Sequence, residues 1–299
     1  MRTPDLVILV HHDEPGPQAR ALVTRAEESG AAAELWSPRD LAVEIDGAGA
    51  RLLHRGDEVL PAVIVPQGIN RSFAFCAEAL RVAEDRGTVV VNPVAASAAC
   101  VDKLATTRIL AAAGVPVLAT RAHPWGARGA GRPPWPGPLV TKPATGSNGE
   151  GVLGHPTADA ARAHLGADRV LGPDGTVGTE LLQPMADGAG EDLRVVVVEG
   201  AAIATTRRRA VAGFVTNGPN ATAEASEDPG AARVAEAAAV ALGLTYGAVD
   251  VIGHDGGPVV LEVNCWPRDL AYVGDLCEVD LVGAVLGAAL AAGARRPSG

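Results

Sequence analysis

The chain has few of the residues that usually signal a disulfide framework, a zinc site or an aromatic core. Its 299 residues include four cysteines, at positions 76, 100, 265 and 277, and no two of them form a C-x-x-C pair. Cysteines scattered in this way fit neither a disulfide framework nor a zinc site. Aromatic residues make up only 3% of the chain, so alanine, valine and leucine must fill the core.

The chain also lacks long apolar runs and an excess of positive charge. No segment approaches about 18 uninterrupted apolar residues, and the short apolar run near the start ends in "HHDE". The formal net charge of −10 argues against nucleic acid as the main partner. We therefore expect a cytoplasmic protein that binds neither nucleic acid nor a membrane. Its length allows one large domain or two to three smaller ones.

Short apolar segments alternate with helical patterns over the first third of the chain. Strands are expected at residues 5–10, 31–37, 61–68 and 88–93, with helices at 17–29 and 73–87. This alternation is typical of a doubly wound parallel sheet. We expect such an α/β domain over residues 1–95.

The remainder of the chain changes to an α+β pattern. A stretch rich in proline and glycine, residues 121–138, is expected to be a loop, and a strand, a glycine turn, a helix and a further strand follow it. Two strand pairs are then expected, one turning at Glu199–Gly200 and one within residues 253–257. A helix ending at Gly243 separates them, and another helix closes the chain.

Two lysines lie in segments suited to binding phosphate. Lys142 precedes a glycine turn in "LVTKPATGSNGEGV", where glycines allow backbone N–H groups to approach a phosphate and the lysine adds charge. Lys103 opens a helix behind Asp102, where its charge opposes the helix dipole and calls for a partner such as phosphate. For Lys142 the alternative is a simple hairpin in which the lysine snorkels to solvent. For Lys103 the alternative is a solvated surface lysine.

Three side chains with oxygen ligands are expected near the end of the last strand pair. In "LEVN", Glu262 and Asn264 share one face of a strand, and Asp250 of "GAVDVIG" lies beside them if the two strands pair. Carboxylates crowded together repel unless a cation lies between them. Oxygen ligands without cysteine or histidine suit Mg²⁺. Charged strand ends in solvent are the alternative.

Arginines mark the first strand pair. Arg194 alternates with apolar neighbours, so it can point into a cleft. In "TRRRA", Arg207 and Arg209 share one strand face and Arg208 takes the other, with a solvated basic edge as the alternative. Asn217 follows in "GFVTN".

Taken in order, these segments resemble the RimK-type group of ATP-grasp ligases, which includes amino-acid ligases of the LysX kind. The resemblance covers about residues 90–290 and rests on "VNPVAASAACVDKLATTRILAAAGVPV", "LVTKPATGSNGEGV", "LLQP", "EDLRVVVV", "RAVAGFVTN", "GAVDVI" and "LEVN". It implies an ATP-grasp fold: the α/β domain at 1–95, a central lid domain at 96–185, and a C-terminal catalytic domain with an antiparallel sheet at 186–299.

The resemblance also implies roles for individual residues. The ATP phosphates would meet Lys103, Lys142 and the loop residues Gly146, Ser147, Gly149 and Gly151. The adenine would be lined by Leu182, Gln183 and Met185. Two Mg²⁺ ions, with Mn²⁺ as an alternative, would be held by Asp250, Glu262 and Asn264, with Glu262 bridging them. The reacting carboxylate and phosphoryl groups would face Arg194, Arg209 and Asn217.

The implied activity is ADP-forming ligation of a carboxylate to an amine, giving a peptide or isopeptide bond through an acyl phosphate. The partners would be ATP, a carboxylate donor and an amine acceptor, either of which could be an amino acid, a peptide or a carrier protein. The family habit makes glutamate the expected added amino acid, and a homo-oligomer is expected. A phosphotransferase or a non-catalytic nucleotide-binding scaffold on the same fold are the alternatives.

Two loops depart from the family pattern where the acceptor is expected. They are "NGPNATA", after the strand that carries "TRRRA", and "EVNCWPRDLAYVGD", at the end of the strand that carries Glu262 and Asn264. Trp266, Arg268 and Asp269 in the second loop are candidates for recognising the acceptor, and simple loop packing is an equally good reading.

Overall fold

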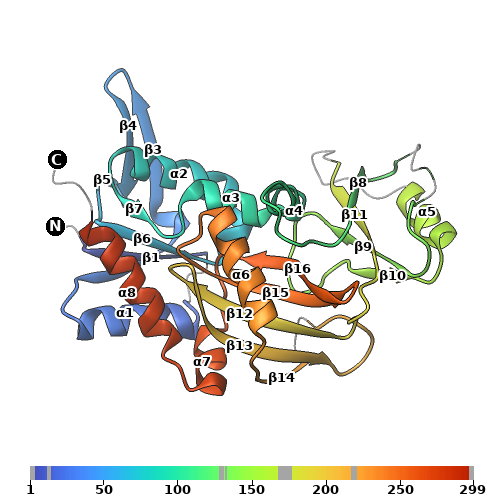
Figure 1. Cartoon of the computed structure of the whole chain (residues 1–299). Coiled ribbons are helices and arrows are strands. Elements are labelled where there is room, and N and C mark those ends of the chain that lie inside the picture. Colours follow the sequence, from blue (N-terminus) through green and yellow to red (C-terminus); the bar gives the residue numbers. More distant parts are fainter. Residues whose placement is uncertain are drawn as a thin grey trace.

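The computed structural model describes residues 4–11, 15–127, 131, 133–167, 177–216 and 221–295. Within these residues the chain forms three sheets arranged along the molecule and a small projecting hairpin sheet (Figure 1). Among the described helices, none is long and apolar enough to cross a bilayer.

The N-terminal sheet is parallel and has helices on both faces, as predicted. Its order is β2 (Ala33–Trp36), β1 (Leu6–Val10), β6 (Val63–Gln67) and β7 (Val89–Val90). Every residue of β1 and β6 is buried. Helix α1 (Pro17–Glu28) and the last helix, α8 (Leu281–Ala294), cover one face, and α2 (Phe73–Asp85) covers the other (Figure 1). Covering both faces explains why these strands read as continuous apolar runs.

A hairpin sheet that the sequence analysis did not predict is inserted between β2 and β6. The short helix η1 (Pro38–Asp40) leads into β3 (Leu41–Asp46), β4 (Gly49–His54) and β5 (Asp57–Glu58). The hairpin of β3 and β4 projects from the body of the protein (Figure 1). Arg55 and Gly56 both have positive φ, which matches the twist of the tight turn between β4 and β5.

The central region is antiparallel. After η2 (Ile69–Ser72) and α2, helices α3 (Val94–Val101) and α4 (Lys103–Ala112) lead to a sheet of order β10 (Leu153–His155), β9 (Leu139–Pro143), β11 (Thr179–Pro184) and β8 (Arg121–Pro124), with α5 (Ala158–Gly166) packed beside it. The expectation of a loop over residues 121–138 was wrong at its start, because Arg121–Pro124 pairs with β11. An edge strand tolerates Pro124, since only one of its sides is hydrogen-bonded.

The C-terminal sheet is also antiparallel and carries both predicted strand pairs. Its order is β14 (Ala221–Ala225), β13 (Ala201–Ala210), β12 (Glu191–Val198), β15 (Tyr246–His254) and β16 (Gly257–Asn264). Helix α6 (Pro229–Leu242) packs on one face, and α7 (Leu270–Cys277) follows β16. The other face carries the polar side chains described below.

The apolar cores show how the three regions are joined. Two large clusters each contain residues of both the N-terminal and the C-terminal sheets, whereas the central sheet has a small cluster of its own, made by Leu139, Ala161, Leu165 and Leu182. Helix α8 returns from the end of the chain to the N-terminal sheet. Division into domains at 1–95, 96–185 and 186–299 stays a proposal, and the separate core of the central region supports its middle part.

Candidate active site

A cleft lies between the central sheet and the C-terminal sheet. The space between its walls, including open solvent at its mouth, is about 790 Å³. Val140 and Met185 line it from the central sheet, and Ile252 and Leu261 line it from the C-terminal sheet. Apolar walls with a few charged groups at one end are typical of a nucleotide site.

The two lysines singled out in the sequence meet at the charged end of this cleft. Lys142 on β9 is only 6% exposed, and its Nζ donates to the carbonyl of Leu261 at 3.2 Å. Lys103 Nζ donates to the carbonyl of Gly146 at 2.7 Å and lies 3.2 Å from Glu262 Oε1. Burial lowers the pKa of Lys142 to about 8, and the nearby charge of Glu262 only partly offsets this effect. A buried ammonium of this kind is poised to bind an anion.

The helix that carries Lys103 begins as predicted. Asp102 caps α4, and its Oδ1 accepts from the backbone N–H groups of Leu104 at 2.8 Å and Ala105 at 3.3 Å. The backbone N–H of Lys103 donates to the carbonyl of Ala144, just after β9. Within the protein, Lys103 contacts Glu262 and the carbonyl of Gly146, and its binding of phosphate stays a prediction.

The glycine loop borders the same end of the cleft. Gly146, Ser147 and Gly149 line it, while Gly151 lies just beyond. Gly151 has a φ of +74°, and a Cβ there would lie 2.8 Å from the ring of Pro143. Glycine is therefore required at this position for both its conformation and its close approach to β9.

Asp250 and Glu262 lie directly opposite each other on neighbouring strands. Residues paired in this way across an antiparallel ladder have Cβ atoms about 5 Å apart. Asp250 Oδ1 is buried and makes no hydrogen bond among the described residues, although Arg194 Nε lies 3.4 Å from it. Asn264 continues the same face of β16, and its Oδ1 accepts from the N–H of Trp266. A buried carboxylate oxygen with spare capacity beside a second carboxylate fits a hard divalent cation.

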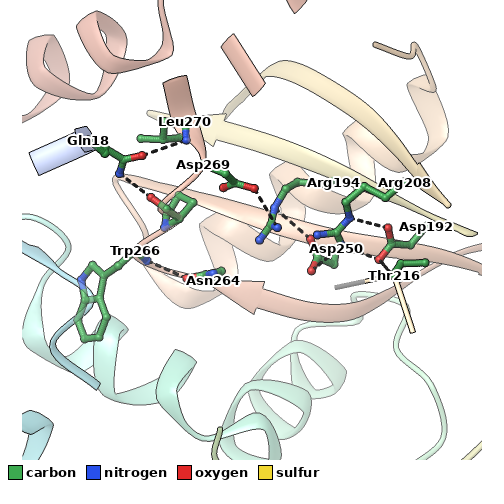
Figure 2. Close-up of polar contacts among 11 residues, drawn as sticks. Gln18, Asp192, Arg194, Arg208, Thr216, Asp250, Asn264, Trp266, Asp269 and Leu270 are labelled. Carbon is green, nitrogen blue, oxygen red and sulfur yellow. Dashed lines mark hydrogen bonds and ion pairs between the residues drawn. The ribbon is translucent and has the colours of Figure 1, made fainter. Parts of the chain in front are cut away.

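Arginines and acids extend this polar face across β12 and β13. Arg194, whose side chain is 10% exposed, lies 3.4 Å from Asp250 through its Nε. Arg208 donates to both oxygens of Asp192, at 2.8 and 2.5 Å, and its Nη2 lies 2.9 Å from Asp250 Oδ2 (Figure 2). Thr216 Oγ1 donates to Asp192 at 2.7 Å. Burial opposes the charge of Arg208, but the two carboxylates together raise its pKa above the ordinary value.

Arg209 does not lie on this face, which corrects the expected active-site position of this residue. Its side chain is 48% exposed and is paired with Glu191 and Glu224. The predicted alternation of the three arginines holds, but the face of Arg208 is the one turned toward Asp250. The geometry therefore favours Arg208 for the role expected of Arg209.

The segment expected to line adenine is only partly in the cleft. Gln183 and Met185 line it, but Leu182 is fully buried in the small core of the central sheet. The backbone N–H of Met185 donates to the carbonyl of Pro138 at 3.0 Å. Asn217, the third residue expected to face the reacting groups, lies outside the described residues.

The loop after β16 divides into packing and polar positions. Trp266 is buried against Phe73, so it packs in the apolar core. Arg268 is exposed, and its Cδ lies close to Gly68. Asp269 Oδ2 lies 3.2 Å from Arg194 Nη1. Sequence reasoning missed Asp192 and Arg208; the "D-L-R" spacing of Asp192 and Arg194 on one strand could have revealed the first.

Comparison with known proteins gives consistent similarities. Residues 101–284 match the RimK-like ATP-grasp domain family. Over 276 residues the chain is 32% identical to a probable alpha-L-glutamate ligase of Xanthomonas euvesicatoria pv. vesicatoria (strain 85-10). The alignment covers 89% of this chain and 91% of the relative.

Solved structures share the fold. The ATP-grasp ligase PsnB complexed with a minimal precursor superposes with a TM-score of 0.72 at 20% identity, covering 97% of this chain and 99% of that one. A RimK domain ATP-grasp protein from Sphaerobacter thermophilus DSM 20745 superposes with a TM-score of 0.68 at 24% identity, covering 95% and 99%.

Proposed function

The chain belongs to the RimK-like ATP-grasp family and is an ATP-dependent carboxylate–amine ligase, and we propose that L-glutamate is one of its two substrates. The glutamate assignment is supported by the relatives, which are named probable alpha-L-glutamate ligases. The observation that carries the proposed site is the Asp250–Glu262 pair, which lies beside Lys103 and Lys142 at the end of an apolar cleft.

In the proposed reaction the γ-phosphoryl group of ATP is transferred to a substrate carboxylate, giving ADP and an acyl phosphate. The amine of the other substrate then attacks the acyl carbon. A C–N bond forms, the C–O bond to phosphate breaks, and a proton is released. Lys103 and Lys142 bind the phosphates, and the glycine loop excludes water that would hydrolyse the acyl phosphate.

The charges of the chain explain why a metal is needed. Among the charged residues that interact with one another at this site, acids and bases balance: they are the acids Asp192, Asp250, Glu262 and Asp269 and the bases Arg194, Arg208, Lys103 and Lys142. These residues therefore provide no surplus positive charge that could neutralise the phosphates of ATP. Two Mg²⁺ ions held by Asp250, Glu262 and Asn264 would neutralise and polarise the phosphoryl groups.

The direct test is to incubate the protein with Mg²⁺, ATP, L-glutamate and a panel of amino acids and short peptides. ADP release is measured, and mass spectrometry identifies the product. We expect an amide product heavier by one glutamyl residue. Glu262→Gln, which removes the charge opposite Asp250, should abolish both readouts while keeping the fold. ADP release without any amide would instead indicate phosphotransfer, and an amide formed with a different amino acid would exclude glutamate.

A further inference from the structure

Asp269 carries a carboxylate that the reaction described above does not use. It pairs with Arg194, which in turn pairs with Asp250. Arg194 therefore lies between Asp250 of the metal strands, β15 and β16, and Asp269 in the turn that follows β16 (Figure 2). The side chain of Asp269 is 35% exposed, whereas that of Arg194 is 10% exposed. A ligand can therefore reach the outer ion pair from the side of Asp269.

This ion pair lies on the same face of the sheet as the nucleotide cleft but farther toward the end of β16 (Figure 2), and neither Arg194 nor Asp269 lines the cleft. Ile252 and Leu261 line the cleft, and β16 runs from Leu261 through Glu262 to Asn264 before the turn begins. Arg194 lies across from Asp250 on the neighbouring strand. A phosphoryl group at Asp250 and Glu262 would have the nucleotide on one side and the Arg194–Asp269 pair on the other.

A glutamine from the N-terminal domain holds the turn in place. Gln18, near the start of α1, is buried, and its Nε2 donates to the carbonyl of Pro267 at 2.6 Å while its Oε1 accepts from the N–H of Leu270 at 3.0 Å. These two bonds flank Arg268 and Asp269. The same Nε2 also donates to Gln67 at 2.8 Å, which fixes the orientation of the amide. The carboxylate of Asp269 is therefore held in a turn of fixed shape.

We propose that Asp269 binds the amino group of the amino-acid substrate while Arg194 binds a carboxylate of that substrate, and that Gln18 is a positioning residue for Asp269. The proposal rests on the proposed function, in which an amino acid is one substrate. The ammonium and one carboxylate of the substrate carry no net charge together, so they can replace the Arg194–Asp269 ion pair without leaving either residue unpaired. A deaminated analogue would leave Asp269 facing a carboxylate, which repels it.

The test compares binding of L-glutamate and glutarate, which share two carboxylates and differ in the amino group. Calorimetry is carried out on the full chain with Mg²⁺ and a non-hydrolysable ATP analogue. The wild type should prefer glutamate by about 10- to 100-fold, the contribution of a charge-assisted hydrogen bond. Asp269→Asn, which keeps the shape of the side chain and removes its charge, should lose most of this preference without changing affinity for the ATP analogue.

Two further variants separate recognition from general damage. Asp275→Asn on α7 makes the same change at an exposed position and should keep the wild-type preference. Gln18→Leu should weaken the preference in the wild-type background. It should have no further effect on the preference in the Asp269→Asn background, because Gln18 acts through Asp269.

Each outcome has a distinct meaning. An unchanged preference in Asp269→Asn, or equal binding of glutamate and glutarate to the wild type, overturns the role of Asp269 and leaves the ligase intact. A thermal-shift screen of the twenty common L-amino acids precedes the titrations. If another amino acid binds, glutamate is excluded, and that amino acid and its deaminated analogue become the probes. If none binds, the proposed amino-acid substrate falls, and the role of Asp269 falls with it.

Discussion

Lys142 combines near-complete burial with a position next to the expected phosphates. Burial lowers its pKa to about 8, so the folded protein releases this proton more readily than the unfolded chain does. A bound phosphate would favour the charged ammonium and raise the pKa again. Nucleotide binding should therefore take up a proton at about pH 8.5 and almost none at about pH 6, where the lysine is already charged.

Proton uptake is measured by calorimetry in two buffers with different ionisation enthalpies. Lys142→Met should abolish the uptake at the higher pH and weaken nucleotide affinity at both. A wild type whose binding enthalpy does not depend on the buffer near pH 8.5 would contradict this role for Lys142.

Arg208 and Arg209 are adjacent in sequence but face opposite sides of the sheet. Arg208 lies between Asp192 and Asp250, where a fixed guanidinium can stabilise the charge that develops on a reacting phosphoryl or carboxylate group. Arg208→Lys keeps the charge but loses the two-pronged bond to Asp192, so we expect kcat to fall by about 10²-fold. Arg209→Lys changes an exposed pair and should keep kcat near that of the wild type.

Single-turnover kinetics of the two variants, with melting curves to show that both are folded, decides between the positions. Equal rate losses in the two variants, or a larger loss in Arg209→Lys, would show that the buried face of β13 does not act in the reaction.

At the scale of elements, two β-bulges explain what the sequence could and could not predict. The tight turns at Glu199–Gly200 and Asp255–Gly256 follow directly from their residue types. Continued without interruption from its turn, the first hairpin would place Asp192 opposite Arg207. The register shifts between Val196 and Val197, which places it opposite Arg208 instead. Residue spacing alone therefore could not show which arginine lies opposite Asp192.

The second hairpin, formed by β15 and β16, also contains a β-bulge. Its turn, continued regularly, would pair Asp250 with Leu261, but the shift next to Asp250 pairs it with Glu262. Bulges arise from tertiary packing and bring functional side chains to one face, and no local sequence rule locates them. Segments with a clear apolar pattern form as expected, because burial alone produces the continuous apolar run of β1 and the helical spacing of α2 and α6.

Helix α4 connects an N-cap to the nucleotide site, and this connection gives a matched pair of variants. Asp102 caps α4, and Asp228 caps α6 by accepting from the N–H of Ala231 at 2.8 Å. Loss of either cap should cost about 0.5–2 kcal/mol of stability. Only Asp102→Ala should also raise the KM for ATP, since Lys103 is the first residue of α4. Urea unfolding and steady-state kinetics check both effects, and equal KM values in the two variants would contradict the link.

At the scale of the whole molecule, the active site depends on contacts between the N-terminal and C-terminal regions. The turn with Asp269 is held by Gln18 of α1, and Gln67 at the end of β6 donates to the hydroxyl of Tyr246 on β15. Helix α8 crosses back to the N-terminal sheet. Sequence patterns placed each of these elements but gave no sign of the polar bonds between them, because such bonds depend on the docking of regions far apart in the chain.

Asn92 makes the densest of these connections and provides a test of their importance. It is fully buried. Its Nδ2 donates to the carbonyls of Tyr246 and Cys265, both at 2.8 Å. Its Oδ1 accepts from the backbone N–H groups of Thr245 at 2.8 Å and Tyr246 at 3.0 Å. One side chain thus satisfies four backbone groups around the start of β15 and the end of β16.

Replacing Asn92 should therefore damage both stability and the site. Asn92→Ala removes the hydrogen bonds to four buried backbone groups, each worth about 1–3 kcal/mol, so we expect a loss of at least about 4 kcal/mol. Asn92→Asp keeps the acceptor but turns a second oxygen toward two carbonyls, so it should be destabilised as well. Affinity for Mg²⁺-nucleotide should also fall, because Cys265 directly follows Asn264. Urea midpoints and nucleotide titrations are compared with Asn70→Ala, an exposed asparagine on η2. A midpoint for Asn92→Ala close to that of Asn70→Ala would show that the two regions dock without this side chain.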